Sequence, residues 1–339
     1  MTLLEHDTQR VEVDQDFDKF AQSQEADDDA ASLTSSTTSL HSSLVNYEWK
    51  HGRRYHSYQA GSYSFPNDER EQERLDMIHH VFYRTLNNRL FLAPINPDDG
   101  LRILDIGTGT GLWAIHLGEE YPGAAEIIGN DLSPIQPRWV PPNVQFIVDD
   151  VELDWVHAGT GTKPYDYVHC RYMAGGIKDW PRLVKQMYDS VKPGGWVEFQ
   201  ESDNTLYSQD GTLTKDNAMV RMMDGLMQAC DKIGRTLDPA PLMKKWVEDA
   251  GFVNVSVQKF RLPVGSWPKD ARLKEVGTLM AVNFIEGVEA FTAALFKDVL
   301  GWSQEEVAAL NAEVKASAKR ANAHAIFDFL VITGQKPEQ

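Results

Sequence analysis

The sequence predicts an α/β fold, a mostly parallel β-sheet with helices on both faces. Two observations lead to this prediction. Apolar segments of strand length alternate with helical segments from residue 101 to residue 260. A glycine-rich turn, "GTGTG", directly follows the apolar segment "RILDI" and precedes an apolar helical segment. Repeated strand–helix units of this kind build parallel sheets, because each crossover helix packs back onto the sheet.

The predicted elements follow in order. Strands are expected at "RILDI" (102–106), "EIIGND" (126–131), "VQFIVDD" (144–150), "YDYVHCR" (165–171) and "WVEFQE" (196–201). Helices are expected at 112–120, 181–191 and 241–250, and "PGG" (193–195) is expected to be a turn, since Pro and Gly favour turns. A sixth strand, "FVNVSVQKF" (252–260), precedes further helices, and "AHAIFDFLVITGQKP" (323–337) holds a final strand.

The chain divides into three segments. Residues 1–43 carry ten Asp or Glu against two Lys or Arg, and nine of the twelve residues 32–43 are Ser or Thr, so a disordered tail is expected. Residues 44–100 form an arm followed by a helix near 67–90, which Asn67 or Asp68 can cap. Residues 101–339 form the main domain, with a helical insertion at about 262–322 that begins its apolar pattern at Leu273 and contains a capping box at Ser303 and Glu306.

Composition excludes several classes of protein. The formal net charge of -17 argues against direct nucleic-acid binding and against binding to anionic membranes. Two cysteines do not make a disulfide framework, and the N-terminus shows no secretory signal, so a cytoplasmic or nuclear protein is expected. His79 and His80 have no second pair of ligands at a suitable spacing, so no metal is expected.

Acidic side chains follow the predicted strands. Asp105 ends the first strand before Gly107, Gly109 and Gly111, Asp131 ends the second, and Asp149 and Asp150 end the third. Ligands of parallel α/β sheets bind at these carboxyl ends. A carboxylate-lined rim disfavours a pyrophosphate and favours a cofactor that carries a sulfonium and an ammonium group, S-adenosylmethionine. The glycine spacing also differs from the G-x-G-x-x-G pattern of dinucleotide-binding proteins.

Individual residues have expected roles and open alternatives. Asp131 is expected to bind a ribose. One of Asp149 and Asp150 is expected to accept a hydrogen bond from adenine, while the other belongs to the turn. Arg171 binds either the cofactor carboxylate or a neighbouring aspartate. The segment "GRRYHSY" (52–58) is either a lid over the cofactor or a packed arm.

Longer motifs resemble those of a known family. The motifs "YEWKHGRRYHSY", "ILDIGTGTGLWAI", "DLSPIQPRWVPPNVQFIVDD" and "VKPGGWVEFQE" make the chain similar to the LaeA-like fungal methyltransferases of class I. The resemblance covers about residues 46–203. It implies a Rossmann-like, seven-stranded sheet with an antiparallel last strand. It also implies cofactor contacts at Asp105, Gly107, Gly109, Gly111, Asp131, Leu132, Asp150 and Val151.

The methyl acceptor stays open at this stage. The resemblance implies either an enzyme of secondary metabolism with a small-molecule acceptor or a nuclear regulator that acts through protein partners. The region 204–322 is expected to set the choice of acceptor through Met219, Met222, Met223, Met280 and Phe284. If a catalytic base is used, the candidates at the rim are Tyr172, Glu201, His56, His169 and Asp203.

Overall fold

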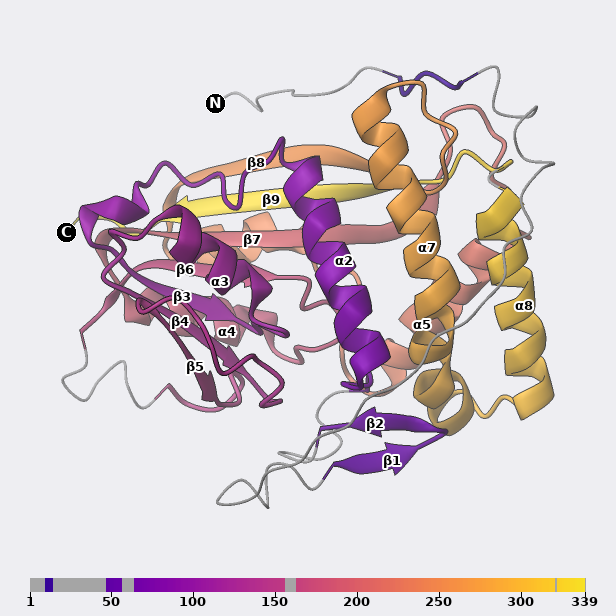
Figure 1. Cartoon of the computed structure of the whole chain (residues 1–339), viewed down its shortest axis with the longest axis horizontal. Helices are drawn as coiled ribbons and strands as arrows, with labels where there is room; N and C mark the ends of the chain where they lie inside the picture. The colour runs from indigo at the N-terminus through magenta and orange to yellow at the C-terminus, as the bar shows by residue number, and fades with distance from the viewer. Residues whose placement is uncertain (1–9, 15–46, 57–63, 156–162, 321, 339) are drawn as a thin grey trace.

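The computed structural model describes residues 10–14, 47–56, 64–155, 163–320 and 322–338. Its centre is a seven-stranded sheet in the order β5-β4-β3-β6-β7-β9-β8 (Figure 1). The strands are β3 (Arg102–Ile106), β4 (Glu126–Asp131), β5 (Val144–Val148), β6 (Tyr165–Arg171), β7 (Val191–Tyr207), β8 (Val253–Pro263) and β9 (Ile326–Gln335). Strands β3 to β7 run parallel, and β9 is antiparallel to both β7 and β8. The predicted fold class and the antiparallel last strand are confirmed.

The prediction for β7 was wrong in one respect. The strand begins at Val191, directly after the preceding helix, so "PGG" lies inside β7 rather than in a turn before it. Two glycines make this possible at an irregularity in the β6–β7 register. Gly194 has a left-handed φ of 78°, and a Cβ on Gly195 would lie 2.8 Å from the Asp166 carbonyl oxygen.

Helices cover both faces of the parallel strands. Helices α4 (Trp180–Ser190) and α6 (Ala240–Asp249) lie on one face, and α3 (Leu112–Glu120) lies on the other. The strands supply both cores because successive side chains point to opposite faces. Ile103 packs with Trp113 of α3, whereas Leu104 packs in the core that contains Val184 of α4. A 3₁₀ turn, η1 (Pro97–Asp99), precedes β3.

Further helices pack where β7, β8 and β9 continue past the parallel strands. Arg171, the last residue of β6, pairs with Gln200, but β7 runs on to Tyr207 beside β9. Helices α2 (Glu69–Thr85), α5 (Ala218–Lys232), α7 (Ala271–Ala294) and α8 (Gln304–Arg320), with the π-helical η2 (Leu295–Val299), share one apolar core with this extension (Figure 1). The predicted helical insertion therefore corresponds to α7, η2 and α8.

One helical stretch, Ala271–Val299, is long and apolar enough to cross a membrane by length and composition. In the described chain 61% of its most apolar window is buried against the rest of the protein. Its side chains explain this: Val276 and Phe284 belong to the apolar core, and Phe284 stacks on Phe327 of β9 at a ring-centroid distance of 5.8 Å. This stretch is therefore a core helix of the folded domain.

The arm is packed against the start of α2. Strands β1 (Glu48–Lys50) and β2 (Arg53–Tyr55) form a small hairpin. Arg53 makes a buried bidentate ion pair with Asp68, with N–O distances of 2.6 and 2.8 Å, and Asp68 also caps α2 by accepting from the Glu71 amide. Of the two alternatives for "GRRYHSY", the described part, residues 52–56, is a packed arm; residues 57 and 58 lie outside the described residues.

Part of the expected disordered tail makes defined contacts. Val13 forms a β-bridge with Pro268, and the Asp14 amide donates to the Trp267 carbonyl oxygen at 2.7 Å. Val11 is buried in a small apolar cluster with Trp267 and Leu273. The prediction was therefore wrong for residues 10–14, because two valines pack on the domain while Glu12 and Asp14 pair with Lys269 and Lys274. The rest of 1–43 lies outside the described residues.

Candidate functional site

A pocket opens at the carboxyl ends of β3, β4, β5 and β6, and we call it the cofactor pocket. Nine of the ten residues predicted to bind the cofactor line it: Asp105, Gly107, Gly109, Asp131, Leu132, Asp149, Asp150, Val151 and Arg171. The tenth, Gly111, does not line it. A Cβ on Gly111 would lie 2.3 Å from the Phe146 ring, so this glycine is required by packing at the start of α3.

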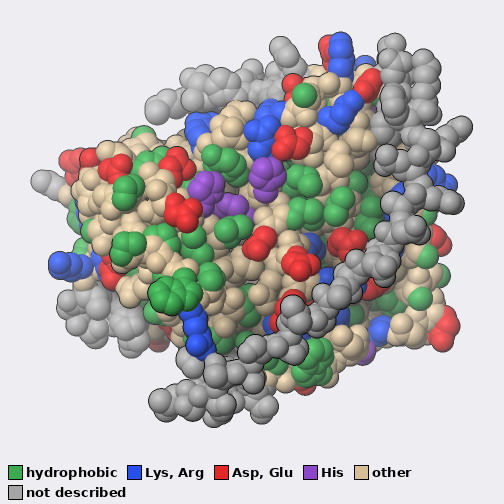
Figure 2. Space-filling model, viewed as in Figure 1, with side chains coloured by type: hydrophobic (Ala, Val, Ile, Leu, Met, Phe, Trp, Pro, Cys, Tyr) green, Lys and Arg blue, Asp and Glu red, His purple; other side chains and the backbone are tan. Residues whose placement is uncertain are grey.

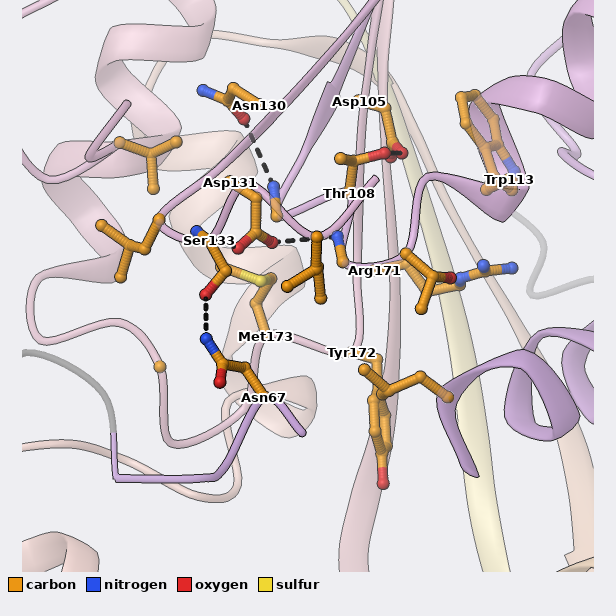
Figure 3. Close-up of a pocket in the computed structure, with 18 of the residues that line it drawn as sticks. Asn67, Asp105, Thr108, Trp113, Asn130, Asp131, Ser133, Arg171, Tyr172 and Met173 are labelled. Carbon is orange, nitrogen blue, oxygen red and sulfur yellow. Dashed lines mark hydrogen bonds between the residues drawn. The ribbon is translucent and has the colours of Figure 1, made fainter. Parts of the chain in front are cut away.

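Asp131 holds the glycine turn in place. Its Oδ2 accepts a hydrogen bond from the Gly109 amide at 2.9 Å, and its Oδ1 accepts from the Ser133 amide at 2.8 Å (Figure 3). Gly109 has a φ of 58°, in the left-handed region that favours glycine. Each carboxylate oxygen keeps a lone pair that a ribose hydroxyl can use. Burial raises the pKa of Asp131 to about 6.

Asp105 is fixed by two neighbours. Its Oδ2 accepts from the Thr108 hydroxyl at 2.6 Å, and its Oδ1 lies 2.7 Å from Nδ1 of His169. His169 is fully buried and stacks on Trp113 at a centroid distance of 3.8 Å. His169 does not line the pocket, so its place in the core argues against the base role that the sequence left open.

Arg171 is oriented by a histidine rather than by an aspartate. Its Nη2 lies 3.0 Å from Nδ1 of His79, whose Nε2 lies 3.2 Å from Nδ1 of His116. Burial, with the charge of Arg171 beside it, lowers the pKa of His79 to about 2, so His79 is neutral and accepts from the guanidinium. Figure 2 shows the histidine side chains that reach the surface near α2 and α3. Arg171 makes no ion pair with another described residue and can bind an anionic group of a ligand.

Asp149 and Asp150 both take part in the turn after β5. Asp149 Oδ1 accepts from the Asp150 amide, and Asp150 Oδ1 accepts from the Glu152 amide, each at 2.9 Å. Both residues also line the cofactor pocket. The prediction that one binds adenine while the other only shapes the turn therefore stays a prediction.

Sequence reasoning did not name most of the residues by which α2 and its start contribute to the cofactor pocket. Asn67 Nδ2 donates to the Ser133 hydroxyl at 3.1 Å, which joins the start of α2 to the loop after β4 (Figure 3). Other lining residues that the sequence did not single out are Leu75, Ile78, Thr108, Thr110, Trp113, Asn130, Ser133, Ile135 and Met173. The spacing of Leu75 and Ile78 indicates an apolar helix face, and nothing in that spacing says that part of this face borders a ligand.

The donor set of the cofactor pocket fits S-adenosylmethionine. Asp105, Asp131, Asp149 and Asp150 contribute carboxylates, and Arg171 is the one cationic side chain among the described lining residues, because His79 is neutral. Such a pocket suits a ligand with an ammonium, a sulfonium and one carboxylate, and it would repel a pyrophosphate. The expected roles of Asp131 toward the ribose and of Arg171 toward the carboxylate stay predictions.

A second pocket adjoins the first, and we call it the acceptor pocket. It is lined by Phe65, Arg74, Tyr172, Ala174, Ser202, Asn204, Met223, Leu226, Leu237, Met280, Asn283, Phe284, Phe291 and Phe327. Tyr172 lines both pockets, and its left-handed φ of 58° follows the end of β6. Figure 3 shows its ring directed away from Asp131. Tyr172 is therefore the shared wall between the two pockets.

The base candidates other than Tyr172 lie outside both pockets. Glu201 is fully buried and accepts from the Met173 amide at 2.6 Å, so it supports the loop that carries Tyr172. His56 is buried close enough to Asp131 to influence its pKa, but it does not line a pocket. Asp203 accepts from the Thr205 amide. These positions argue against a base role for Glu201, His56 and Asp203.

Glu201→Gln should remove a pH dependence of stability. Burial raises the pKa of Glu201 to about 8, against 4.5 for the exposed side chain. Between these values the unfolded chain has lost a proton that the folded chain retains, so the free energy of unfolding falls as pH rises. Glutamine keeps an oxygen for the Met173 amide and does not titrate. The melting temperature of Glu201→Gln, relative to wild type, should rise by a few degrees from pH 5 to pH 8.

The control for this measurement is Glu119→Gln, which changes an exposed residue of α3. Its melting temperature relative to wild type should stay constant over the same range. A constant difference for Glu201→Gln as well would show that Glu201 is ionised in the folded protein.

Comparison with known proteins identifies the family of the chain. A family model described as "Methyltransferase domain" matches residues 77–257, more than half of the chain. Methyltransferase pytC of Aspergillus terreus is 64% identical over 315 residues, which cover 92% of this chain and 96% of that protein. Secondary metabolism regulator LAE1 of Cochliobolus heterostrophus is 32% identical over 91% of this chain and 100% of its own length.

A third relative, protein-methionine methyltransferase laeA of Emericella nidulans, is 33% identical over 85% of this chain and 76% of its own length. Among solved structures, coclaurine N-methyltransferase aligns with 77% of this chain and 72% of its own, at 14% identity and a TM-score of 0.44. The family model and the curated relatives decide the assignment. The chain belongs to the methyltransferase-domain family and is an S-adenosylmethionine-dependent methyltransferase of the LaeA-like group.

Proposed function

We propose that this enzyme methylates a small, largely apolar molecule that binds in the acceptor pocket. The observation that carries the proposal is the shared wall: Tyr172 borders both the carboxylate-lined pocket and the apolar one. When bound, S-adenosylmethionine supplies an activated methyl group, so that a lone pair of the acceptor forms the new bond while sulfur keeps the electrons of the broken bond. The chain's task is then to hold two ligands in line at contact distance.

The walls of the acceptor pocket support an apolar ligand. Met223 and Leu226 come from α5, Met280 and Phe284 from α7, and Phe327 from β9. Methionine side chains adapt to irregular shapes, which suits a ligand of low symmetry. Of the five residues expected to set acceptor choice, Met223, Met280 and Phe284 line the pocket. Met219 and Met222 do not, because they point into the core shared by α5 and its neighbours.

The proposal is tested by the fate of the methyl group. The full chain is incubated with isotopically methyl-labelled S-adenosylmethionine and a cell extract, and the protein and small-molecule fractions are separated before mass spectrometry. The label should appear in a small molecule, and Met223→Ala should alter the amount formed while S-adenosylmethionine affinity stays within about threefold. Label confined to proteins of the extract would overturn the proposal and would favour a protein acceptor.

A further inference from the structure

We infer that the acceptor pocket takes a neutral or anionic molecule with a carbonyl-type oxygen, and that it rejects protonated amines. The inference rests on the proposed function, because it concerns the same pocket. It is carried by polar side chains that line that pocket, of which Asn283, Arg74 and Ser202 matter most.

The amide of Asn283 has a defined orientation. Arg74 Nη1 donates to Asn283 Oδ1 at 2.6 Å, and a guanidinium can only donate, so this atom must be the oxygen. The residue is 4% exposed and lines the acceptor pocket, and its Nδ2 makes no hydrogen bond to a described residue. Buried amide groups are nearly always hydrogen-bonded. Asn283 therefore offers N–H donors to a ligand.

Arg74 carries a charge that is already balanced. Its Nε and Nη2 donate to the two carboxylate oxygens of Glu71 at 3.0 and 2.6 Å, and both side chains are 4% exposed. The guanidinium lies over the rings of Phe291 and Tyr172, at 5.0 and 5.9 Å. The negative charge of Glu71 is thus balanced by Arg74, and Glu71 is not among the residues that line the acceptor pocket.

A further polar group, Ser202, agrees with this selection. Ser202 is 7% exposed, and its hydroxyl makes no hydrogen bond to a described residue, so it too can donate. No aspartate or glutamate is among the described residues that line the acceptor pocket. An ammonium ion there would meet a guanidinium and no carboxylate among the described lining residues to balance its charge. An oxygen with lone pairs can accept from Asn283 or from Ser202.

The chemical class of the methyl acceptor follows. It has an apolar body for the methionine and phenylalanine walls and a hydrogen-bond-accepting oxygen for Asn283. The atom that receives the methyl group is then an oxygen, a carbon or a non-basic nitrogen, rather than the nitrogen of a protonated amine.

Two probes of similar size, one with a neutral carbonyl head group and one with a protonated amine, test whether the acceptor pocket rejects amines. Wild-type protein saturated with S-adenosylhomocysteine is titrated with 1-phenylbutane-1,3-dione and with 4-phenylbutan-2-amine at pH 7. The dione should bind at least tenfold more tightly. Asn283→Asp keeps an oxygen for Arg74 and replaces the N–H donors with a second oxygen, so it should weaken dione binding about tenfold and leave S-adenosylhomocysteine affinity within threefold. Gln304→Glu makes the same amide-to-carboxylate change at an exposed residue of α8, outside both pockets, so it is the control and should preserve the preference.

The labelled products give an independent readout. If the label enters small molecules, those products should pass through a cation-exchange column at pH 4. Their retention would overturn this inference and leave the proposed function standing, whereas absence of any labelled small molecule would count against the proposed function itself. Equal affinity for the two probes, or a dione affinity that Asn283→Asp leaves unchanged, would also overturn the inference.

Discussion

Asp131→Ala should lower the affinity for S-adenosylmethionine about ten- to a hundredfold. A hydrogen bond to a charged group is worth roughly 1.5–3 kcal/mol, which corresponds to this range. The loss has two sources in the structure. The variant removes the oxygens available to the ribose, and it releases the amides of Gly109 and Ser133 that Asp131 holds at 2.9 and 2.8 Å. Isothermal titration calorimetry measures the affinity directly.

A matched control separates the local effect from the change in net charge. Asp249→Ala removes a carboxylate from the exposed end of α6. Asp249 does not line the cofactor pocket and is far in sequence from the residues that do. It should bind S-adenosylmethionine as wild type does. If Asp131→Ala also binds as tightly as wild type, another acid holds the ribose, and the ligand is oriented differently from the arrangement inferred here.

Asp131 also predicts a pH dependence of cofactor binding. Its pKa of about 6 in the folded protein means that the carboxylate gains a proton as the pH falls through 6. The protonated group loses acceptor capacity, so affinity should fall between pH 7 and pH 5. Asp131→Asn, which cannot titrate, should show a smaller change over this range.

Much of the fold could be predicted because local patterns and the sheet agree. Strands β3, β4 and β6 and helix α3 have the residues that alternation and periodicity indicated. The misplaced start of β7 has a physical cause. Pro and Gly favour a turn locally, but the backbone of "PGG" approaches β6 and residue 336 closely enough to be held in the sheet. That close approach is a property of tertiary packing, which the tripeptide alone does not reveal.

The cofactor pocket was easier to predict than the acceptor pocket for a related reason. Asp105, Asp131 and the Asp149–Asp150 pair lie at strand ends, and strand ends of a parallel sheet meet by topology. The acceptor pocket instead gathers Arg74, Ser202 and Asn283 from α2, β7 and α7, which are far apart in sequence. The extension of β7 beyond its predicted end, beside β9, helps to bring these elements together. The spacing of residues within each element does not encode that arrangement.

Replacing Asp68, which pairs with Arg53 of the arm, should lower the free energy of unfolding more than substitutions within the arm. Arg53 and Asp68 are 11% and 12% exposed at their side chains, and they bind each other through two hydrogen bonds. Loss of one partner of a buried pair typically costs about 3–5 kcal/mol, because the other charge is left without compensation. Asp68→Ala also removes the cap of α2, which adds about 1 kcal/mol. Chemical denaturation of wild type and variant measures the difference.

A double variant separates the ion pair from the cap. Asp68→Asn keeps an oxygen for the Glu71 amide but leaves the Arg53 guanidinium unbalanced, so it should still lose most of the stability. Adding Arg53→Met removes the unpaired charge and should restore part of it. If the double variant is no more stable than Asp68→Asn, the ion pair is not the cause. Asn67, next to the cap, and Leu75 and Ile78 of α2 line the cofactor pocket. The affinity for S-adenosylmethionine should therefore fall together with stability in Asp68→Asn. Both should recover in part in the double variant.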